Sequence, residues 1–260
     1  MRRLFPLLLL LACEPPPDVP GLPPPRPPSA RAEVRLAGDA VVTGLVQRLA
    51  EEFTARNPGA LLVVEAPLGG RGALRALQDG VLDAALLAVG PGETAPAGAI
   101  GLASTRVVLA AGRATGLRGR WSPLALKAAL TTPEPGPLRF ILRGTDDPLQ
   151  RALVVASPAL GPAFERAQVE QRWLTLADDA AVRDALRATP GAVVVADTGS
   201  LALHGLPVWS VVVGDAAPVV GLSLQLRPDA PDRLRAFVAW ATGPDGQALV
   251  QEFGYGSPGP

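Results

Sequence analysis

The chain has few of the residues on which most enzymes and covalent scaffolds depend. It contains a single cysteine, so no disulfide and no cysteine cluster can form within one chain. Its single histidine, His204, lies in the sequence Leu-His-Gly, with no cysteine nearby and no recognisable serine elbow elsewhere. A catalytic triad or a metal site therefore has little to build on. We expect a protein that is not an enzyme and that holds no metal and no cofactor, with His204 in a loop or on the surface.

Charge and aromatic content exclude a second class of function. Lys and Arg number 24 and Asp and Glu number 24, so the formal net charge is zero, and no basic face recurs along the chain. A nucleic-acid-binding surface would need such a face to neutralise phosphates. The chain also has one tyrosine and 4% aromatic residues, too few for a stack of base-binding rings. We therefore expect no nucleic-acid partner.

The position of the cysteine explains its presence. Two arginines precede an apolar run from Leu4 to Leu11, which is too short to span a bilayer, and Ala12 and Cys13 follow. The tetrapeptide Leu-Leu-Ala-Cys resembles the lipobox of bacterial lipoproteins, in which the signal is cut before an acylated cysteine. We therefore interpret residues 1–12 as a signal peptide and Cys13 as the site of lipidation. The alternative is a plain secretory peptide with an incidental cysteine.

A proline-rich segment separates this anchor from the folded part. Residues 13–30 contain PPPDVP and PPPRPP, a composition that favours an extended polyproline II tether. The alternative is that this segment is a ligand for an SH3-like domain. Glu14, the residue after the cysteine, favours the outer membrane by resemblance to lipoprotein sorting rules. We expect a cell-envelope protein that is lipid-anchored at the periplasmic face and folded from about Arg31 onward.

The stretch from Glu33 to Ala88 organises the folded part. It reads as strand, glycine turn, amphipathic helix, strand, glycine-rich turn, second helix and third strand. The first helix carries an apolar stripe at helical spacing, formed by Leu45, Val46, Leu49, Ala50 and Phe53. Alternation of strands and helices continues to the C-terminus, with Ser122 as a predicted N-cap and Asp178-Asp179 capping a later helix. This order predicts an α/β fold with parallel strands covered by helices.

Two glycine turns in this stretch are candidate ligand sites. They are Gly38-Asp39 and the run from Gly69 to Gly72, and each opens onto a predicted helix. In parallel sheets, ligands lie beyond the carboxyl ends of the strands, where helix N-termini present free backbone N–H groups. A glycine-rich turn can also be no more than a tight turn.

Four segments together resemble one family of proteins. They are GDAVVTGLVQRLAEEFTARNPG, GGRGALRALQDGVLDAALLA, TPGAVVVAD and FVAWATGPDGQALVQEFGYGSP. Their order and spacing resemble the type II periplasmic binding proteins, close to the phosphate-binding proteins of ABC transporters. The resemblance implies a two-lobed α/β fold. Each lobe would be a mostly parallel sheet flanked by helices, two crossing strands would join the lobes, and the ligand would lie in the cleft between them. Lobe one would comprise residues 31–104 and 206–260, and lobe two residues 105–205.

The resemblance also implies which residues bind ligand. Those that match the family's site by position are Asp39, Ala40, Arg143, Gly144 and Thr145. Gly70 and Arg71 are added as candidates from the glycine-rich turn itself, since arginine suits carboxylate and phosphate. The hydroxyl positions of the first turn have been lost, because Asp39, Ala40 and Val41 stand there. Asp39 is a suitable N-cap, but its carboxylate would repel an oxyanion placed beside it. Arg143 has two interpretations: it binds an anion, or it pairs with Asp146 or Asp147 on the lobe surface.

These inferences lead to two hypotheses of function. The first is a monomeric solute-binding lipoprotein of an ABC importer, which binds a small phosphate-like anion and has an ABC permease as its partner. The second is a divergent sensory or protein-interaction lipoprotein that has kept the fold and binds no solute.

Overall fold

The computed structural model describes residues 33–59, 61–132 and 137–259. The predicted signal peptide, the predicted lipidation site Cys13 and the predicted proline-rich tether lie outside the described residues. Within the described part, no helix is long and apolar enough to cross a membrane.

A first group of strands begins with three that pair in parallel. β1 (Val34–Gly38) lies between β2 (Leu62–Val64) and β3 (Ala84–Val89). β10 (Val219–Leu226) then pairs antiparallel with β3 and with the first half of β4 (Ile100–Gly112). We call this group the first sheet, and its three parallel strands are those that the sequence predicted between Glu33 and Ala88.

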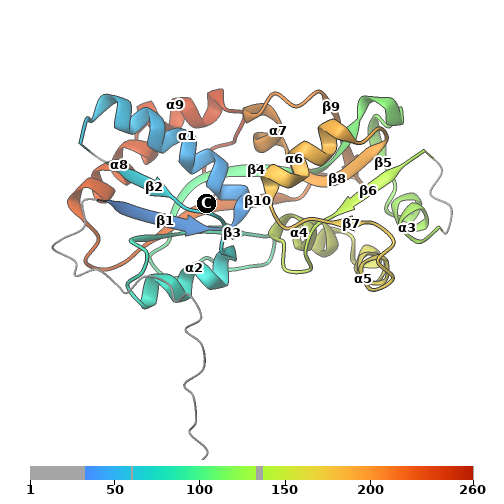
Figure 1. Cartoon of the computed structure of the whole chain (residues 1–260), viewed down its shortest axis with the longest axis horizontal. Helices are drawn as coiled ribbons and strands as arrows, with labels where there is room; N and C mark the ends of the chain where they lie inside the picture. Colours follow the sequence, from blue (N-terminus) through green and yellow to red (C-terminus); the bar gives the residue numbers. More distant parts are fainter. Residues whose placement is uncertain (1–32, 60, 133–136, 260) are drawn as a thin grey trace, which may run out of the picture. The chain divides into compact units, whose positions relative to one another are not determined.

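Helices cover both faces of the first sheet. Because successive side chains of a strand point to opposite faces, each strand contributes to two apolar clusters. Leu36 and Leu86 lie in the largest core cluster, together with apolar residues of α1 (Ala40–Arg56). The neighbouring residues Ala37 and Leu87 belong to a separate cluster with Ala73 and Leu77 of α2 (Gly69–Gln78). Figure 1 shows α1 and α2 on opposite sides of β1 and β3. Strands buried on both faces read as continuous apolar runs, which explains the sequence of β3.

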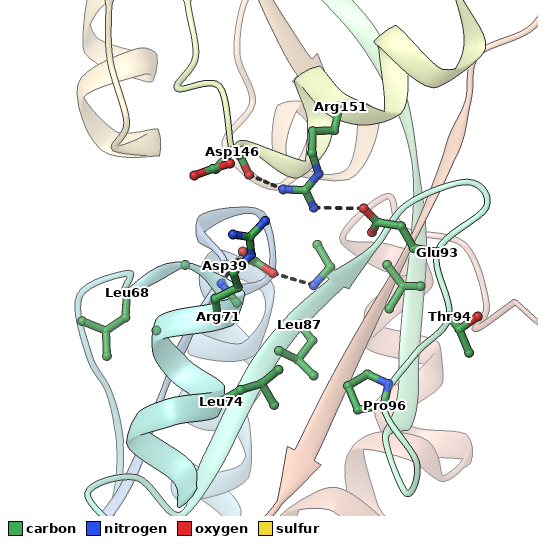
Figure 2. A pocket seen from close by; sticks show the side chains of 15 residues that line it. Asp39, Leu68, Arg71, Leu74, Leu87, Glu93, Thr94, Pro96, Asp146 and Arg151 are labelled. Atoms are coloured by element: carbon green, nitrogen blue, oxygen red, sulfur yellow. Dashed lines mark hydrogen bonds and ion pairs between the residues drawn. The ribbon is translucent and has the colours of Figure 1, made fainter. Parts of the chain in front are cut away.

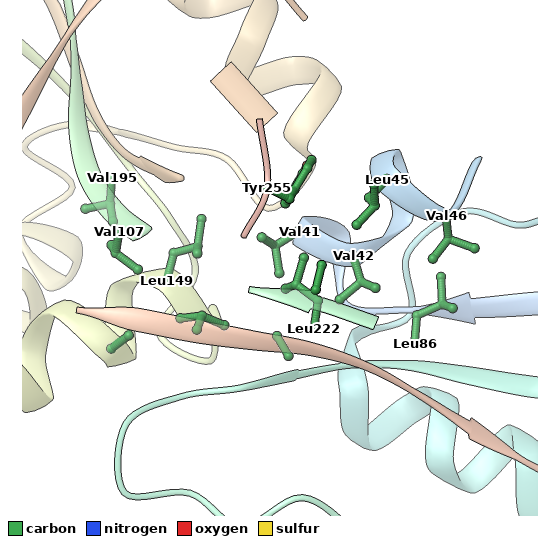
Figure 3. Close-up of a cluster of buried hydrophobic side chains, with 14 of the residues drawn as sticks. Val41, Val42, Leu45, Val46, Leu86, Val107, Leu149, Val195, Leu222 and Tyr255 are labelled. Atoms are coloured by element: carbon green, nitrogen blue, oxygen red, sulfur yellow. The ribbon is translucent and has the colours of Figure 1, made fainter. Parts of the chain in front are cut away.

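The predicted apolar stripe of α1 is confirmed. All five of its residues are buried, and the helix also buries Val41 and Val42 near its start. Figure 3 shows Leu45 and Val46 beside Leu86 of β3 and Leu222 of β10. Burial of four such aliphatic side chains stabilises the fold by about 6 to 12 kcal/mol before the loss of conformational entropy is counted. α8 (Asp232–Thr242) and α9 (Pro244–Glu252) complete this layer, and each contacts α1.

A second group of strands forms around the second half of β4. Its members are β4 from Val107 onward, β5 (Gly119–Trp121), β6 (Arg139–Leu142), β7 (Leu174–Thr175), β8 (Ala192–Asp197) and β9 (Val208–Val213). β8 and β9 pair antiparallel with β4, whereas β6 pairs in parallel with β7 and β8, and β5 in parallel with β9. We call this group the second sheet.

Helices also cover both faces of the second sheet. One face packs against helices that carry buried Leu126, Leu149 and Phe164, and the other against helices that carry Val182 and Leu201. The first three helices are α3 (Pro123–Thr131), α4 (Pro148–Ala156) and α5 (Gly161–Val169), and the other two are α6 (Asp179–Ala188) and α7 (Thr198–Leu203). Short 3-10 helices, η2 and η3, span Arg113–Thr115 and Pro158–Leu160.

Strand β4 connects the two sheets. Its pairing with β10 runs from Ile100 to Arg106, and its pairing with β8 begins at the next residue, Val107. The chain returns to the first sheet between β9 and β10. We expected this return near residue 206 from the sequence, but β9 pairs within the second sheet. The difference arises because β9 and β10 are both apolar runs, and periodicity alone does not tell which sheet a strand joins.

Candidate functional site

A cavity of about 530 Å³ lies beyond the carboxyl end of β3. The start of α2 and the loop after β3 form one side, and residues at and near the start of α4 form the other. We call it the first cavity. Figure 2 shows its labelled side chains converging from these elements. Its lining residues are Asp39, Leu68, Gly69, Gly70, Arg71, Gly72, Leu74, Leu87, Ala88, Val89, Glu93, Thr94, Pro96, Asp146 and Arg151.

Both carboxylate oxygens of Asp39, in the lining of the first cavity, accept hydrogen bonds from the backbone. One carboxylate oxygen, Oδ1, accepts a hydrogen bond from the backbone N–H of Gly70 at 2.7 Å. The other, Oδ2, accepts one from the backbone N–H of Ala88 at 2.8 Å. We call these two N–H groups the amide pair. They come from different elements, the start of α2 and the end of β3, so the Asp39 side chain links these two elements to the start of α1.

This geometry corrects the prediction that Asp39 caps α1. Asp39 holds the N-cap position with extended backbone, yet its side chain makes no capping hydrogen bond to α1. It turns instead to the amide pair, which accounts for both of its oxygens. Glycine makes this approach possible, because a Cβ on Gly70 would lie 2.8 Å from the Asp39 carboxylate. Sequence reasoning identified both residues but not the contact between them, since they are separated by 31 positions.

The electrostatics of Asp39 reflect two opposing effects. Burial raises the pKa of its carboxyl above the usual value, and the hydrogen bonds from Ala88 and Gly70 pull the pKa back down. The guanidinium of Arg151 acts in the same direction as the amides. A carboxylate held by two N–H donors is the arrangement by which backbone amides bind anions.

Arg143 does not line the first cavity. It directly follows β6, its side chain is 4% exposed, and its Nε donates to the carbonyl oxygen of Val195 in β8 at 2.5 Å. Its Nη1 forms ion pairs with Asp147 at 3.0 Å and with Asp179 at 2.6 Å. Burial alone would lower the pKa of Arg143, but the carboxylates of Asp179 and Asp147 raise it above its ordinary value. Two carboxylates therefore neutralise the arginine.

The contacts of Arg143 agree with one of the two interpretations drawn from the sequence, except that the pair is not on the surface. Arg143 pairs with Asp147, as that interpretation proposed, but the pair is buried and includes Asp179 of α6. Gly144 and Thr145 follow it in a turn, where the carbonyl of Gly144 accepts from the N–H of Asp147. Neither residue is among those that line the first cavity.

Arg151 and Glu93 were missed by sequence reasoning. Arg151, on α4, forms an ion pair with Glu93 of the loop after β3 at 3.2 Å and also donates to the backbone carbonyl of Asp146. Figure 2 shows this contact reaching across the first cavity. A signal for Arg151 was present, because it lies four residues after Asp147, which caps α4, and so falls on the same face of that helix. Glu93 lies in a loop without periodicity and gave no signal.

Known proteins resemble this chain in structure rather than in sequence. No protein-family model and no curated protein sequence matches it. A putative phosphate ABC transporter substrate-binding protein with bound phosphate from Clostridium perfringens has a TM-score of 0.67, with 11% identity over 87% of this chain and 100% of that one. The periplasmic molybdate-binding protein of Azotobacter vinelandii has a TM-score of 0.60, with 13% identity over 87% and 100%.

A third structure agrees with these two. An ABC-type phosphate transport receptor from Vibrio cholerae has a TM-score of 0.57, with 15% identity over 86% of this chain and 100% of that one. This chain has the type II periplasmic-binding-protein fold. The predicted fold class, two α/β lobes with helices on both faces of their sheets, is confirmed. At these identities the likeness establishes the fold and not the ligand.

In this periplasmic-binding-protein fold, the first cavity has a mixed but net negative charge. Its ionisable lining residues comprise two arginines and three carboxylic acids, so the formal sum is −1; they are Arg71, Arg151, Asp39, Glu93 and Asp146. Arg151 is paired with Glu93, as described above. Arg71 forms no ion pair with any residue that the structure describes, and Figure 2 shows its side chain rising from α2 into the cavity.

A second cavity of about 480 Å³ lies along α1 of the same fold and includes Ala40, the start of α6 and His204. Ala40 therefore faces a different cavity from Asp39, Gly70 and Arg71. His204 ends α7 and is half-buried, and burial is the main effect that lowers its pKa. No group of three or more His, Cys, Asp or Glu side chains within the described ranges is arranged to hold a metal ion.

Proposed function

We propose that this chain is the solute-binding component of an ABC-type importer in the cell envelope, held to the membrane by a lipid at Cys13. The observation that carries the proposal is the first cavity. It lies at the carboxyl ends of parallel strands, between residues of the first sheet and residues of α4. The roles for which the similar structures are named, phosphate transport and molybdate binding, support it by analogy.

Solute binding would be coupled to movement of the two sheets toward each other. Arg151 and Glu93 lie on opposite sides of the first cavity and pair across it. A ligand shifts such an equilibrium by as much as its affinity differs between the open and closed forms. The form that carries solute would then be the one recognised by a permease.

Calorimetric titration of the full chain, purified in detergent, tests this proposal. The panel would contain inorganic oxyanions, small carboxylates, amino acids and sugars, and small-angle scattering would follow the radius of gyration. We expect heat with at least one class of solute and a smaller radius in its presence. If no solute gives heat and no solute changes the radius, the chain is not a solute-binding protein.

Variants of two arginines locate the binding. Arg71→Ala removes a guanidinium that lines the first cavity, and we expect the affinity for the solute to change about tenfold or more, falling for an anionic or hydrogen-bonded neutral solute and rising for a positively charged one. Arg113→Ala is the matched control, because Arg113 lies over the ring of Trp209, away from the first cavity. Equal effects of the two substitutions would place the solute elsewhere.

The lipid anchor requires a separate test, since Cys13 is outside the described residues. Cells fed a labelled fatty acid should incorporate label into the wild-type chain and not into the Cys13→Ser variant. Label in the variant at the wild-type level would contradict lipidation at Cys13.

One observation favours a second candidate, a sensory or protein-interaction lipoprotein that binds no solute. Asp39 accepts from both N–H groups of the amide pair, and two carboxylates pair with Arg143, so these groups suited to an anion are already satisfied by the chain itself. This candidate predicts no heat with any member of the panel and a partner protein recovered by crosslinking in intact envelopes.

A further inference from the structure

The amide pair already holds an anion, and that anion belongs to the chain. Both Asp39 oxygens lie within hydrogen-bonding distance of an N–H, at 2.7 Å for Gly70 and 2.8 Å for Ala88. The two donors belong to different elements and line the first cavity of about 530 Å³. The Asp39 carboxylate, which belongs to the cavity lining, thus takes the position that a free anion bound by these two amides would occupy.

The second sheet shows the same feature independently. Arg143 is the arginine that the sequence offered as an anion ligand, and Asp147 and Asp179 both pair with it. The formal charge of the first cavity is −1, and Arg71 is the cationic lining residue that has no ion pair within the described part of the chain. An oxyanion that entered would meet the Asp39 carboxylate, with the amide pair already engaged. The negative charges of the oxyanion and of the Asp39 carboxylate would repel each other, and burial strengthens this repulsion.

We infer that Asp39 is the specificity-determining residue of the first cavity. Its carboxylate acts as a tethered anion that excludes free oxyanions such as phosphate, sulfate and molybdate. It presents a hydrogen-bond acceptor to solutes that are neutral or positively charged and that donate hydrogen bonds. This inference rests on the proposed function, in which the first cavity is the solute-binding site. It replaces the sequence-based expectation of a phosphate-like ligand.

The test is the binding of inorganic phosphate, sulfate and molybdate to the full chain and to Asp39→Ser. Serine is a good N-cap residue, so α1 keeps a suitable N-cap while the amide pair becomes free. We expect no oxyanion binding by the wild type at concentrations up to about 10 mM and a dissociation constant below about 1 mM for the variant. Asp39→Gly, which frees the same amides, should give the same gain.

Two further variants separate the possible causes of a gain. Asp39→Asn removes the charge but fills the same space, so it should gain much less than Asp39→Ser if the freed amide pair binds the oxyanion. Asp178→Ser removes another carboxylate that accepts from two backbone amides, those of Ala180 and Ala181, and it should gain nothing. Adding Arg71→Ala to Asp39→Ser should weaken the new binding, because Arg71 lines the same cavity.

Two outcomes would overturn the inference. One is phosphate binding by the wild type with an affinity within threefold of that of Asp39→Ser. The other is a folded Asp39→Ser or Asp39→Gly variant, verified by its thermal transition, that binds none of the three oxyanions. Both can be told apart from failure of the proposed function, which depends on whether the wild type binds any solute of the larger panel.

Discussion

At the scale of single residues, Asp197 is a buried carboxyl whose environment opposes its charge. It ends β8, is 1% exposed, and accepts from the hydroxyl of Thr105 at 2.9 Å and the N–H of Ser200 at 2.8 Å. Burial raises its pKa to about 6, from 3.8, although the hydrogen bonds from Ser200 and Thr105 act in the opposite direction. It lies where β4 passes from one sheet to the other, since Thr105 and Val107 belong to that strand.

The pH dependence of unfolding follows from this shift. A carboxyl with a raised pKa in the folded state binds its proton more tightly when folded, so its contribution to stability is most favourable below about pH 4 and falls as the pH rises through about 6. Asp197→Asn keeps an oxygen that can accept both hydrogen bonds and removes the charge. We expect it to stabilise the chain by about 1 to 3 kcal/mol at pH 7. Denaturant unfolding at pH 4, 5, 6 and 7 measures this, and an equal gain at all four values would contradict it.

Arg143 should contribute to stability rather than to ligand binding. Replacement by methionine leaves Asp147 and Asp179 without their shared cation, and breaking a buried pair in this way costs about 3 to 5 kcal/mol. Arg166→Ala is the control, because its pair with Glu170 is exposed to solvent and should contribute little to stability. Urea unfolding of both variants would show the difference. A loss below about 1 kcal/mol for Arg143→Met would contradict a structural role.

At the scale of elements, the spacing of β1 and β3 depends on Gly38. A Cβ at this position would lie 1.9 Å from the carbonyl oxygen of Leu86, on the neighbouring strand. The amide of Asp39 bonds to that same oxygen at 2.9 Å, so any separation of the strands also disturbs the residue that holds the amide pair. The turn that the sequence marked as a ligand site is therefore first a point of close strand contact.

Gly38→Ala tests this contact. We expect it to lower the free energy of unfolding by about 3 kcal/mol or more, because the clash is with backbone atoms and must move a strand. Gly144→Ala serves as the comparison, since a Cβ there would meet nothing within 4 Å, and we expect a change below about 0.5 kcal/mol. Thermal and urea unfolding provide the measurement, and similar changes for the two variants would argue against the proposed clash.

The elements themselves were largely predictable from the sequence, because local chemistry determines them. Ser122 was expected to cap a helix and does so through the N–H of Ala125, and Asp178 does so through Ala180 and Ala181. The stripe on α1 follows from helical periodicity. The contacts of Asp39 and Arg143 could not be predicted in this way. Asp39 meets residues 31 and 49 positions away, and Arg143 meets Asp179 of α6, so tertiary folding determines both.

At the scale of the whole molecule, the ion pair of Arg151 and Glu93 links the two sides of the first cavity. Both side chains are about 40% exposed, at 39% and 41%, so the pair should contribute little to stability. Glu93→Gln should therefore change the free energy of unfolding by less than about 1 kcal/mol. A free-energy difference of about 1 kcal/mol can still shift an equilibrium between open and closed forms about fivefold.

Scattering detects such a shift without unfolding. We expect the radius of gyration of Glu93→Gln to exceed that of the wild type when no solute is present. Glu170→Gln is the control, because Glu170 pairs with Arg166 and Arg172 and lies away from the first cavity. An unchanged radius for Glu93→Gln would show that this ion pair does not hold the two sides together.

The central claim is that a carboxylate of the chain itself fills the amide pair of a periplasmic-binding-protein fold. The most direct measurement is the dissociation constant of inorganic phosphate for the wild type and for Asp39→Ser, determined side by side by calorimetry. We expect no measurable binding by the wild type and a dissociation constant below about 1 mM for the variant. Tight phosphate binding by the wild type, or none by a folded variant, would contradict the role of Asp39.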